Sequence, residues 1–338
     1  MMQIKKWLLY SSLFIVLIIT TVFSLMLWSD TYSNTHYKRT KFYSEPNKNV
    51  LKVHYILENK TKYDSFIFGS SRVGSINPLK IANGKYYNMT YSEGIPKEHL
   101  LNIQLFLNKG VKIKNLLIGL DEFSYQVSFK KHQHQALTKA YYEATHTPFI
   151  NYYRELYLRF PLGEDRHHIA KKIKHSKNYF SMDISKQTKN YQNAMKAFNR
   201  AKFTTPEHIN DKIFDKPTYY SGNTLTSTLK DIQKIKNLCK QNSIECNFFI
   251  NPIHHKTYEY TNHKLLKEFK KGLSKITSFY DFSIQSPLTH DNSYWHETSH
   301  YTLEVGDMII NTIYNKKSLL NKNSIPFVFI NYKEPDAL

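Results

Sequence analysis

Cysteine is almost absent from this chain of 338 residues, which contains only Cys239 and Cys246. So few thiols argue against a zinc site of the thiolate-rich kind. The two cysteines lie where a predicted helix ends and a predicted strand, residues 247–250, begins. A disulfide across that turn and two separate buried thiols both fit this spacing, and export into an oxidising compartment would favour the disulfide.

Acidic residues are also scarce, because 27 Asp and Glu residues stand against 47 Lys and Arg residues and leave a formal charge of +20. Such a charge is typical of proteins that bind nucleic acid, whose phosphates it neutralises. It equally fits a domain near a membrane, where it meets anionic headgroups or an acidic envelope polymer, and scattered lysines can simply solvate a surface. Because an apolar N-terminal segment indicates a membrane, we expect no nucleic-acid partner.

Charge is missing altogether between Trp7 and Trp28. As a helix, this segment spans about 33 Å, which is enough for the hydrocarbon core of a bilayer. A signal peptide and a buried helix of a soluble protein are the alternatives, but no small-x-small cleavage site follows the segment. We therefore expect an uncleaved, single-pass anchor in the cell membrane, with the rest of the chain outside the cytoplasm, in the periplasm or on the outer face.

The remaining chain is too apolar for a disordered protein, with 41% hydrophobic and 15% aromatic residues. Its length allows one anchor and one domain of roughly 250 to 300 residues. We expect a membrane anchor in residues 1–30, a stalk and first helix in 31–60, and a single domain in 61–338 with a mostly helical insertion at about 126–222. No internal repeat is evident.

Strand and helix patterns alternate through this domain, as they do in a parallel sheet covered by helices. Short apolar runs predict the strands, and apolar residues at helical spacing predict the helices. We therefore expect an α/β fold with a parallel sheet sandwiched by helices and one appended edge strand. The predicted strands are 65–68, 86–88, 115–120, 247–250, 279–282 and 326–330, and the predicted helices are 50–59, 96–108, 225–241, 263–276 and 304–314.

The first chemical signal is the sequence Gly69-Ser70-Ser71, which follows the apolar run 66–68. A serine there lies at the carboxyl edge of a strand, where α/β folds place their chemistry. We expect a helix to begin at this point. Ser71 is the expected nucleophile and Ser70 is its rival, while an ordinary turn is the alternative for the whole segment.

The second signal lies near the end of the domain, where Glu297 and His300 are three positions apart. On one turn, a carboxylate can orient an imidazole, and that imidazole can take a proton from a serine. We predict that Ser71, His300 and Glu297 form a catalytic triad. Asp291 and His296 lie close by in the sequence, and Asp291 is a second candidate for the acid.

These two blocks resemble those of the SGNH (GDSL-type) hydrolase superfamily, in which an early Gly-Asp-Ser block carries the nucleophile and a late Asp-x-x-His block closes the domain. The Gly-Ser-Ser variant is similar to that of a membrane-anchored branch, which includes the D-alanyl transfer protein of teichoic-acid systems and alginate O-acetylation proteins. The resemblance covers most of residues 60 to 315 and implies the flavodoxin-like parallel sheet of SGNH hydrolases. It implies a serine acyltransferase or carbohydrate esterase that forms an acyl-serine intermediate on Ser71 and uses no cofactor.

The resemblance also implies an oxyanion hole built from the nucleophile's amide, a glycine and an asparagine. Gly94, or the amide of Ser92, occupies the glycine position after the second predicted strand. Asp121 stands where the asparagine is expected, and an ionised carboxylate there repels an oxyanion unless it is protonated or turned away. Arg72 is expected either to bind an anionic group of the substrate or to pair with a carboxylate inside the fold.

The same resemblance implies the partners. Members of this branch work beside a multispan membrane O-acyltransferase, so we expect such a protein here, together with the membrane and an envelope glycan that accepts the acyl group, which is expected to be acetyl. The alternative is a catalytically inactive SGNH-like scaffold or glycan-binding protein, and Asp121 is the residue that favours it.

Several histidines cluster in the predicted insertion, and imidazole is a common metal ligand. Their spacing is irregular and contains no HExxH pattern, so we expect a basic, partly exposed surface and no metal site. The residues concerned are His132, His134, His146, His167, His168 and His175.

Overall fold

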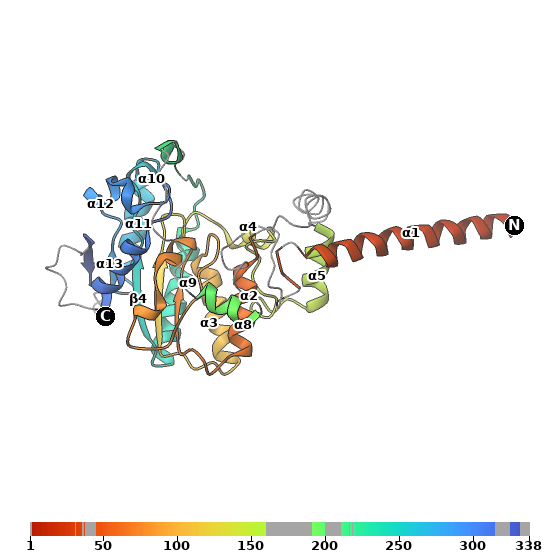
Figure 1. Ribbon diagram of the computed structural model, residues 1–338, viewed down its shortest axis with the longest axis horizontal. Coiled ribbons are helices and arrows are strands. Elements are labelled where there is room, and N and C mark those ends of the chain that lie inside the picture. Colours follow the sequence, from red (N-terminus) through yellow and green to blue (C-terminus); the bar gives the residue numbers. More distant parts are fainter. Residues whose placement is uncertain are drawn as a thin grey trace.

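The computed structural model describes residues 2–30, 32–35, 37, 45–159, 191–199, 211–215, 217, 219–314 and 325–331. These residues form an α/β fold, in which a six-stranded, mostly parallel sheet lies between helices and a long N-terminal helix projects from the domain (Figure 1). The predicted α/β class with a parallel sheet and helices on both faces is therefore confirmed.

The sheet contains five parallel strands and one antiparallel edge strand, in the order β2-β1-β3-β4-β5-β6. The chain adds β2 on one side of β1 and then places β3 on the other side, so the direction of winding reverses between β1 and β3. In doubly wound sheets, the carboxyl ends of the strands at such a reversal flank the crevice that binds ligands. The strands are β1 (Ser65–Phe68), β2 (Tyr86–Asn88), β3 (Asn115–Leu120), β4 (Glu245–Ile250), β5 (Phe279–Asp281) and β6 (Val328–Ile330).

Side chains of the central strands alternate between two hydrophobic cores, because successive residues of a strand point to opposite faces. Phe66 and Phe68 of β1 pack with α2, α3, α9 and α11, whereas Ile67 packs with α13. Leu116 and Leu117 of β3 divide in the same way. The helices of the first core are α2 (Lys48–Glu58), α3 (Pro96–Asn108), α9 (Leu225–Gln241) and α11 (His263–Leu273); those of the second are α13 (Leu303–Tyr314) and the 3-10 helix η1 (Ser71–Ser75).

Short helices connect these layers and make up the described part of the predicted insertion. Within that insertion, residues 160–190, 200–210, 216 and 218 lie outside the described residues. The insertion contains α4 (Phe129–Gln133), α5 (Phe149–Arg159), α8 (Tyr191–Phe198) and the 3-10 helix η3 (Asp211–Asp215). The other short elements are η2 (Pro78–Lys80), α10 (His255–Glu259), α12 (Pro287–His290) and η4 (Asn292–Tyr294).

The N-terminal helix α1 (Met2–Ser29) stands away from the domain (Figure 1). Its segment Gln3–Leu25 has a mean hydropathy of 2.3 and buries none of its apolar window, so length and composition allow it to cross a membrane. Apolar side chains exposed on every side are stable in lipid rather than in water. The predicted apolar helix is thus confirmed, and it is consistent with an anchor or a signal sequence.

Local hydrogen bonds explain where the observed helix boundaries differ from the predicted ones. The predicted helix 50–59 begins at Lys48, because the side chain of Asn47 caps it by accepting a 3.1 Å hydrogen bond from the amide of Val50. The helix expected at Ser71 is only the short η1. Asn77 is extended, as the residue before a proline usually is, so no helix continues into Pro78.

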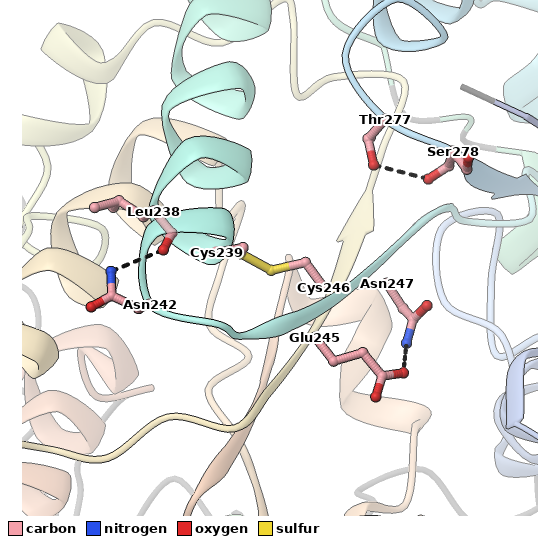
Figure 2. The surroundings of a disulfide bond; sticks show 8 residues. All are labelled: Leu238, Cys239, Asn242, Glu245, Cys246, Asn247, Thr277 and Ser278. Carbon is pink, nitrogen blue, oxygen red and sulfur yellow. Dashed lines mark hydrogen bonds between the residues drawn. A yellow bond between two sulfur atoms is a disulfide. The ribbon is translucent and has the colours of Figure 1, made fainter. Parts of the chain in front are cut away.

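The two cysteines form a disulfide that joins the end of α9 to β4 (Figure 2). Cys239 and Cys246 are seven residues apart, and their Cα atoms lie 6.4 Å from each other. The turn between them is closed by Asn242, whose side-chain amide donates a 2.9 Å hydrogen bond to the carbonyl of Leu238 (Figure 2). The cysteine spacing allowed either a disulfide or two separate buried thiols, and the structure contains the disulfide.

Candidate active site

Ser71 lies just beyond the carboxyl end of β1, on the β1 side of the winding reversal. Gly69 makes the turn into η1, with φ of +158°, and a Cβ there would lie 2.7 Å from a methyl group of Val73. Only glycine fits such a close approach without displacing its neighbours. The loop is also bonded to β2, because the side-chain amide of Asn88 donates to the carbonyl of Val73 at 2.7 Å.

The two serines of this turn have different environments. Ser70 is fully buried, and its hydroxyl accepts a 3.2 Å hydrogen bond from the amide of Arg72, so it caps η1. Ser71 is only partly buried. Among the described residues, Ser71 is therefore the serine of the block whose hydroxyl is open to a second molecule.

The late block of the sequence meets Ser71 across 229 residues of chain, because Nε2 of His300 lies 2.7 Å from Oγ of Ser71. The other ring nitrogen of His300, Nδ1, is hydrogen-bonded to a carboxylate oxygen of Glu297. The second oxygen of Glu297 accepts a 2.8 Å hydrogen bond from the amide of Ser299. The three predicted triad residues are thus brought together in the order Ser–His–Glu.

The electrostatics of Glu297 favour the ionised form. Burial raises the pKa of this carboxyl, but hydrogen bonding and the nearby charge of His300, together with the Ser299 amide, outweigh it, so the pKa lies below the usual value. The side chains of His300 and Glu297 remain 26% and 28% exposed. An ionised carboxylate on Nδ1 favours the tautomer in which Nε2 carries the lone pair that accepts a proton from a hydroxyl.

A rigid turn holds this acid–base pair in place. Trp295 and Tyr301 form an antiparallel bridge, inside which the amide of His296 donates to the carbonyl of His300 at 2.8 Å. The indole of Trp295 is fully buried and donates a 3.1 Å hydrogen bond to the carbonyl of Leu288. The turn is tied to η1, because the hydroxyl of Ser75 donates to the carbonyl of Tyr301 at 2.6 Å.

Asp291, the other candidate for the acid, has a different role. Its carboxylate accepts a 2.9 Å hydrogen bond from the amide of Ser293 and caps η4. Glu297 is therefore the carboxylate on His300.

Arg72 lies in the interior, directly behind the partly exposed Ser71. It is 1% exposed and forms ion pairs with Asp121, at 3.2 Å, and with both carboxylate oxygens of Glu122. Its guanidinium also reaches the hydroxyl of Ser299 at 3.4 Å, beside the triad acid. Of the two predicted roles for Arg72, pairing inside the fold is the one that these contacts support.

The same contacts account for Asp121, the residue that conflicts with a conventional oxyanion hole. Asp121 is 1% exposed, and its carboxylate accepts a hydrogen bond from the side-chain amide of Asn251 at 3.0 Å as well as the one from Arg72. Burial raises its pKa to about 6, although the charge of Arg72 acts in the opposite direction. The carboxylate is therefore turned into a paired network.

Glu122 and Asn251 were missed by sequence reasoning, yet both belong to this network. Glu122 follows the end of β3, and Asn251 directly follows β4, where it also accepts a 2.8 Å hydrogen bond from the hydroxyl of Tyr301. Polar residues at the carboxyl ends of adjacent parallel strands are the signal that could have identified them.

The structure places the predicted oxyanion residues near the nucleophile loop without testing their role. Gly94 packs against this loop, since a Cβ on it would lie 2.6 Å from the carbonyl of Gly69. Among the described residues, the amide of Ser71 donates no hydrogen bond. The hydroxyl of Ser92 donates to Glu45 at 3.3 Å, while the role predicted for Ser92 concerns its amide and stays a prediction.

A buried histidine outside the predicted triad lies between two carboxylates. His132 of α4 is bonded to Glu98 at 2.9 Å and to Glu93 at 3.3 Å. Burial lowers the pKa of His132, but the hydrogen bonds to Glu93 and Glu98 outweigh this and raise it to about 9. The protonated imidazole therefore fastens α4 to the start of α3 and the loop before it.

Among the described residues, no group of three or more His, Cys, Asp or Glu side chains is arranged to hold a metal ion. Of the predicted histidine cluster, His132, His134 and His146 therefore form no such group. His167, His168 and His175 lie outside the described residues.

Comparisons of the sequence give no match: no protein-family model and no curated protein is similar to the chain. What the fold and the site define is therefore an α/β protein whose first strand presents a serine to a histidine–glutamate pair at the carboxyl edge of the sheet.

Proposed function

We propose that the chain is a membrane-anchored serine O-acyltransferase or esterase of the SGNH type, whose domain lies outside the cytoplasm and acts on O-acyl groups, acetyl being the expected one, of an envelope polysaccharide. The observation that carries this proposal is the 2.7 Å contact between Nε2 of His300 and Oγ of Ser71. A serine is a weak nucleophile until a base within hydrogen-bond reach takes its proton.

In the first half of the reaction, Oγ of Ser71 attacks the carbonyl carbon of an acyl ester while Nε2 of His300 takes the hydroxyl proton. Glu297 holds the proton of Nδ1 and stabilises the imidazolium that forms. The amides of Ser71 and Gly94 bind the tetrahedral oxyanion. As the intermediate collapses, His300 returns the proton to the departing alcohol, and the acyl group remains on Ser71.

In the second half, a hydroxyl group resolves the acyl-serine. The incoming hydroxyl gives its proton to His300, its oxygen attacks the acyl carbon, and Ser71 leaves with the proton from Nε2. A sugar hydroxyl makes the reaction a transfer, whereas water makes it a hydrolysis. The two reactions use the same residues and differ only in the molecule that enters.

Two further observations support the SGNH type. The five parallel strands follow the order 2-1-3-4-5, one of the common doubly wound orders, and the nucleophile block comes after the first strand. The buried pairing of Asp121 with Arg72 and Asn251 also removes an isolated negative charge from the neighbourhood of Ser71. That charge was the main argument for an inactive scaffold.

The proposed location and partners are supported by less specific observations than the triad. The apolar α1 and the disulfide between Cys239 and Cys246 favour anchoring or export. A multispan membrane O-acyltransferase as donor partner, and an envelope glycan as acceptor, follow from the resemblance of the Gly-Ser-Ser and Glu-x-x-His blocks alone.

The test is mass spectrometry of the full chain in detergent after exposure to a serine-reactive fluorophosphonate. We expect an adduct on Ser71 that disappears in Ser71→Ala and in His300→Ala and persists in Ser70→Ala, the matched control. No adduct on a folded wild-type protein would overturn the proposal and support the scaffold or glycan-binding alternative.

A further inference from the structure

Two large apolar side chains are exposed next to each other at the start of α5. Phe149 is 58% exposed and Ile150 is 76% exposed. Large apolar side chains in such a position mark contact with another apolar phase more often than single scattered ones do. Phe149 and Ile150, with Tyr142 and Tyr153 beside them, are called the α5 surface below.

The α5 surface is aromatic as well as apolar. The ring of Phe149 lies 4.4 Å from that of Tyr153 and 5.6 Å from that of Tyr142. Tyrosine rings with a polar tip next to an apolar body are typical of residues at a membrane–water interface. Arg154, the next residue of α5, is exposed and carries the charge that suits lipid phosphates.

The chain that leaves α1 is fastened to the domain almost at once. Asp30, the residue after α1, accepts a 2.9 Å hydrogen bond from the amide of Asn34. Asn34 in turn donates to the carbonyl of Ala136 at 3.2 Å, and Asn47 donates to the same carbonyl at 2.9 Å. From Ser29 to Asn34 even an extended chain covers less than about 20 Å.

α5 packs against this same short connection. The hydroxyl of Tyr153 donates to the carbonyl of Asn34 at 3.4 Å and is paired with the hydroxyl of Tyr37. Tyr32 packs with Tyr152 in a small core of its own. Figure 1 shows α5 at the end of the domain that α1 enters. If α1 spans a bilayer, its exit point and α5 therefore lie at the same side of the domain.

We propose that the α5 surface docks into the lipid–water interface of the bilayer that α1 spans, so that the domain rests on the membrane with one face. This inference depends on the anchor in the proposed function, and it goes beyond it by assigning a second lipid contact. Two contacts, the span and the α5 surface, hold a domain in one orientation, whereas a span alone leaves it free to rotate about its tether. Such docking fixes the height of Ser71 above the bilayer.

The test uses the full chain in lipid nanodiscs that contain brominated phosphatidylcholine and no other protein. Single cysteines are introduced at Ile150→Cys, at Leu79→Cys and at Val16→Cys and labelled with a fluorophore that bromine quenches at short range. Leu79 is 76% exposed, as Ile150 is, so it is the matched control on the domain, and Val16 lies within the apolar part of α1. The native cysteines are joined in the disulfide and do not take the label.

We expect strong quenching at position 16, quenching at least half as strong at position 150, and none at position 79. Quenching at 16 but not at 150 would overturn the docking and leave the anchor intact, and it would point instead to a protein partner for the α5 surface. Quenching at none of the three would show that α1 does not enter the bilayer, which contradicts the anchor itself. A cooperative thermal unfolding transition in each variant checks that the domain is folded.

Discussion

The two edges of the parallel sheet differ in what they contain. At the carboxyl edge, Ser71, Asp121 and Asn251 follow β1, β3 and β4, and Asp121 is bonded to both Arg72 and Asn251. At the amino edge lies a cavity of about 550 Å³, lined in part by Glu245, Cys246 and other residues that begin or precede strands. The lining of that cavity contains no histidine.

The difference shows that strand direction decides where polar side chains from distant parts of the chain gather in this fold. Parallel strands bring all their carboxyl ends to one edge, so that loops from distant parts of the chain converge there. His300 reaches Ser71 in this way across most of the domain. The amino edge instead contains a covalent cross-link, because the disulfide joins α9 to β4 beside the cavity.

The largest expected effect comes from removing the nucleophile. Ser71→Ala should lower acyl-ester turnover by at least about a thousandfold, because no other group can form the acyl intermediate. Ser278→Ala, a serine in the lining of the amino-edge cavity, is the matched control and should leave turnover unchanged. Turnover of a chromogenic acetyl ester measures both. If Ser278→Ala were the damaging change, the chemistry would belong to the amino edge.

A large loss of stability is expected from Arg72→Met. Asp121 and Glu122 would then be buried without their counter-charge, and removing one partner of a buried ion pair costs about 3–5 kcal/mol. Lys80→Met is the control at the amino edge, since Lys80 pairs with Asp307 while 54% exposed and such pairs contribute about 1 kcal/mol or less. Urea unfolding gives both values. Equal losses of unfolding free energy would mean that the ion pairs at the two edges contribute equally to stability.

Removing the disulfide should separate stability from activity. Cys239→Ser combined with Cys246→Ser frees a short loop and should lower the free energy of unfolding by about 2.5 kcal/mol. The change lies at the amino edge, so labelling of Ser71 by fluorophosphonate should persist. Reductant should destabilise the wild type but not the double variant. A loss of Ser71 labelling in the folded variant would show that the two edges are coupled.

The smallest expected effect is a pH dependence at the carboxyl edge. The pKa of His132 is raised from 6.5 to about 9, so its bonds to Glu93 and Glu98 stabilise the fold fully below about pH 6.5. That contribution is lost as the pH rises through about 9. We expect the Tm of the wild type to fall by a few degrees over this window. His132→Gln should show a smaller fall; an unchanged fall would assign the dependence to other groups.

Much of the fold could be predicted because its signals are local. Apolar runs and helical spacing placed β1, β2, β3, α3 and α9 at their observed bounds. Boundaries that depend on a cap were harder, as the start of α2 at Lys48 shows, since a single hydrogen bond from the Val50 amide decides it. The short η1 in place of the expected helix likewise depends on the proline that follows.

Residues of the candidate site could be predicted where they belong to a sequence motif. They could not be predicted where only tertiary contacts bring them into the site. The Gly-Ser-Ser and Glu-x-x-His blocks contain the residues of the Ser–His–Glu arrangement. Glu122 and Asn251 belong to no motif, and their role arises only when strand ends meet. The bonding of His132 between two carboxylates also joins segments that no spacing connects.

Short stretches of sequence were enough to predict the apolar helix, the order of strands and helices, and the Gly-Ser-Ser and Glu-x-x-His blocks that contain Ser71, His300 and Glu297, because each of these features depends on residues near one another in the chain. Only the folded chain shows that Ser70 is buried, that Arg72 pairs inward with Asp121 and Glu122, and that the cysteines are joined. Burial, ion pairing and the disulfide depend on which side chains come into contact in the folded interior, where water is excluded. Burial makes an unpaired charge costly, and only the folded chain shows where each one finds its partner.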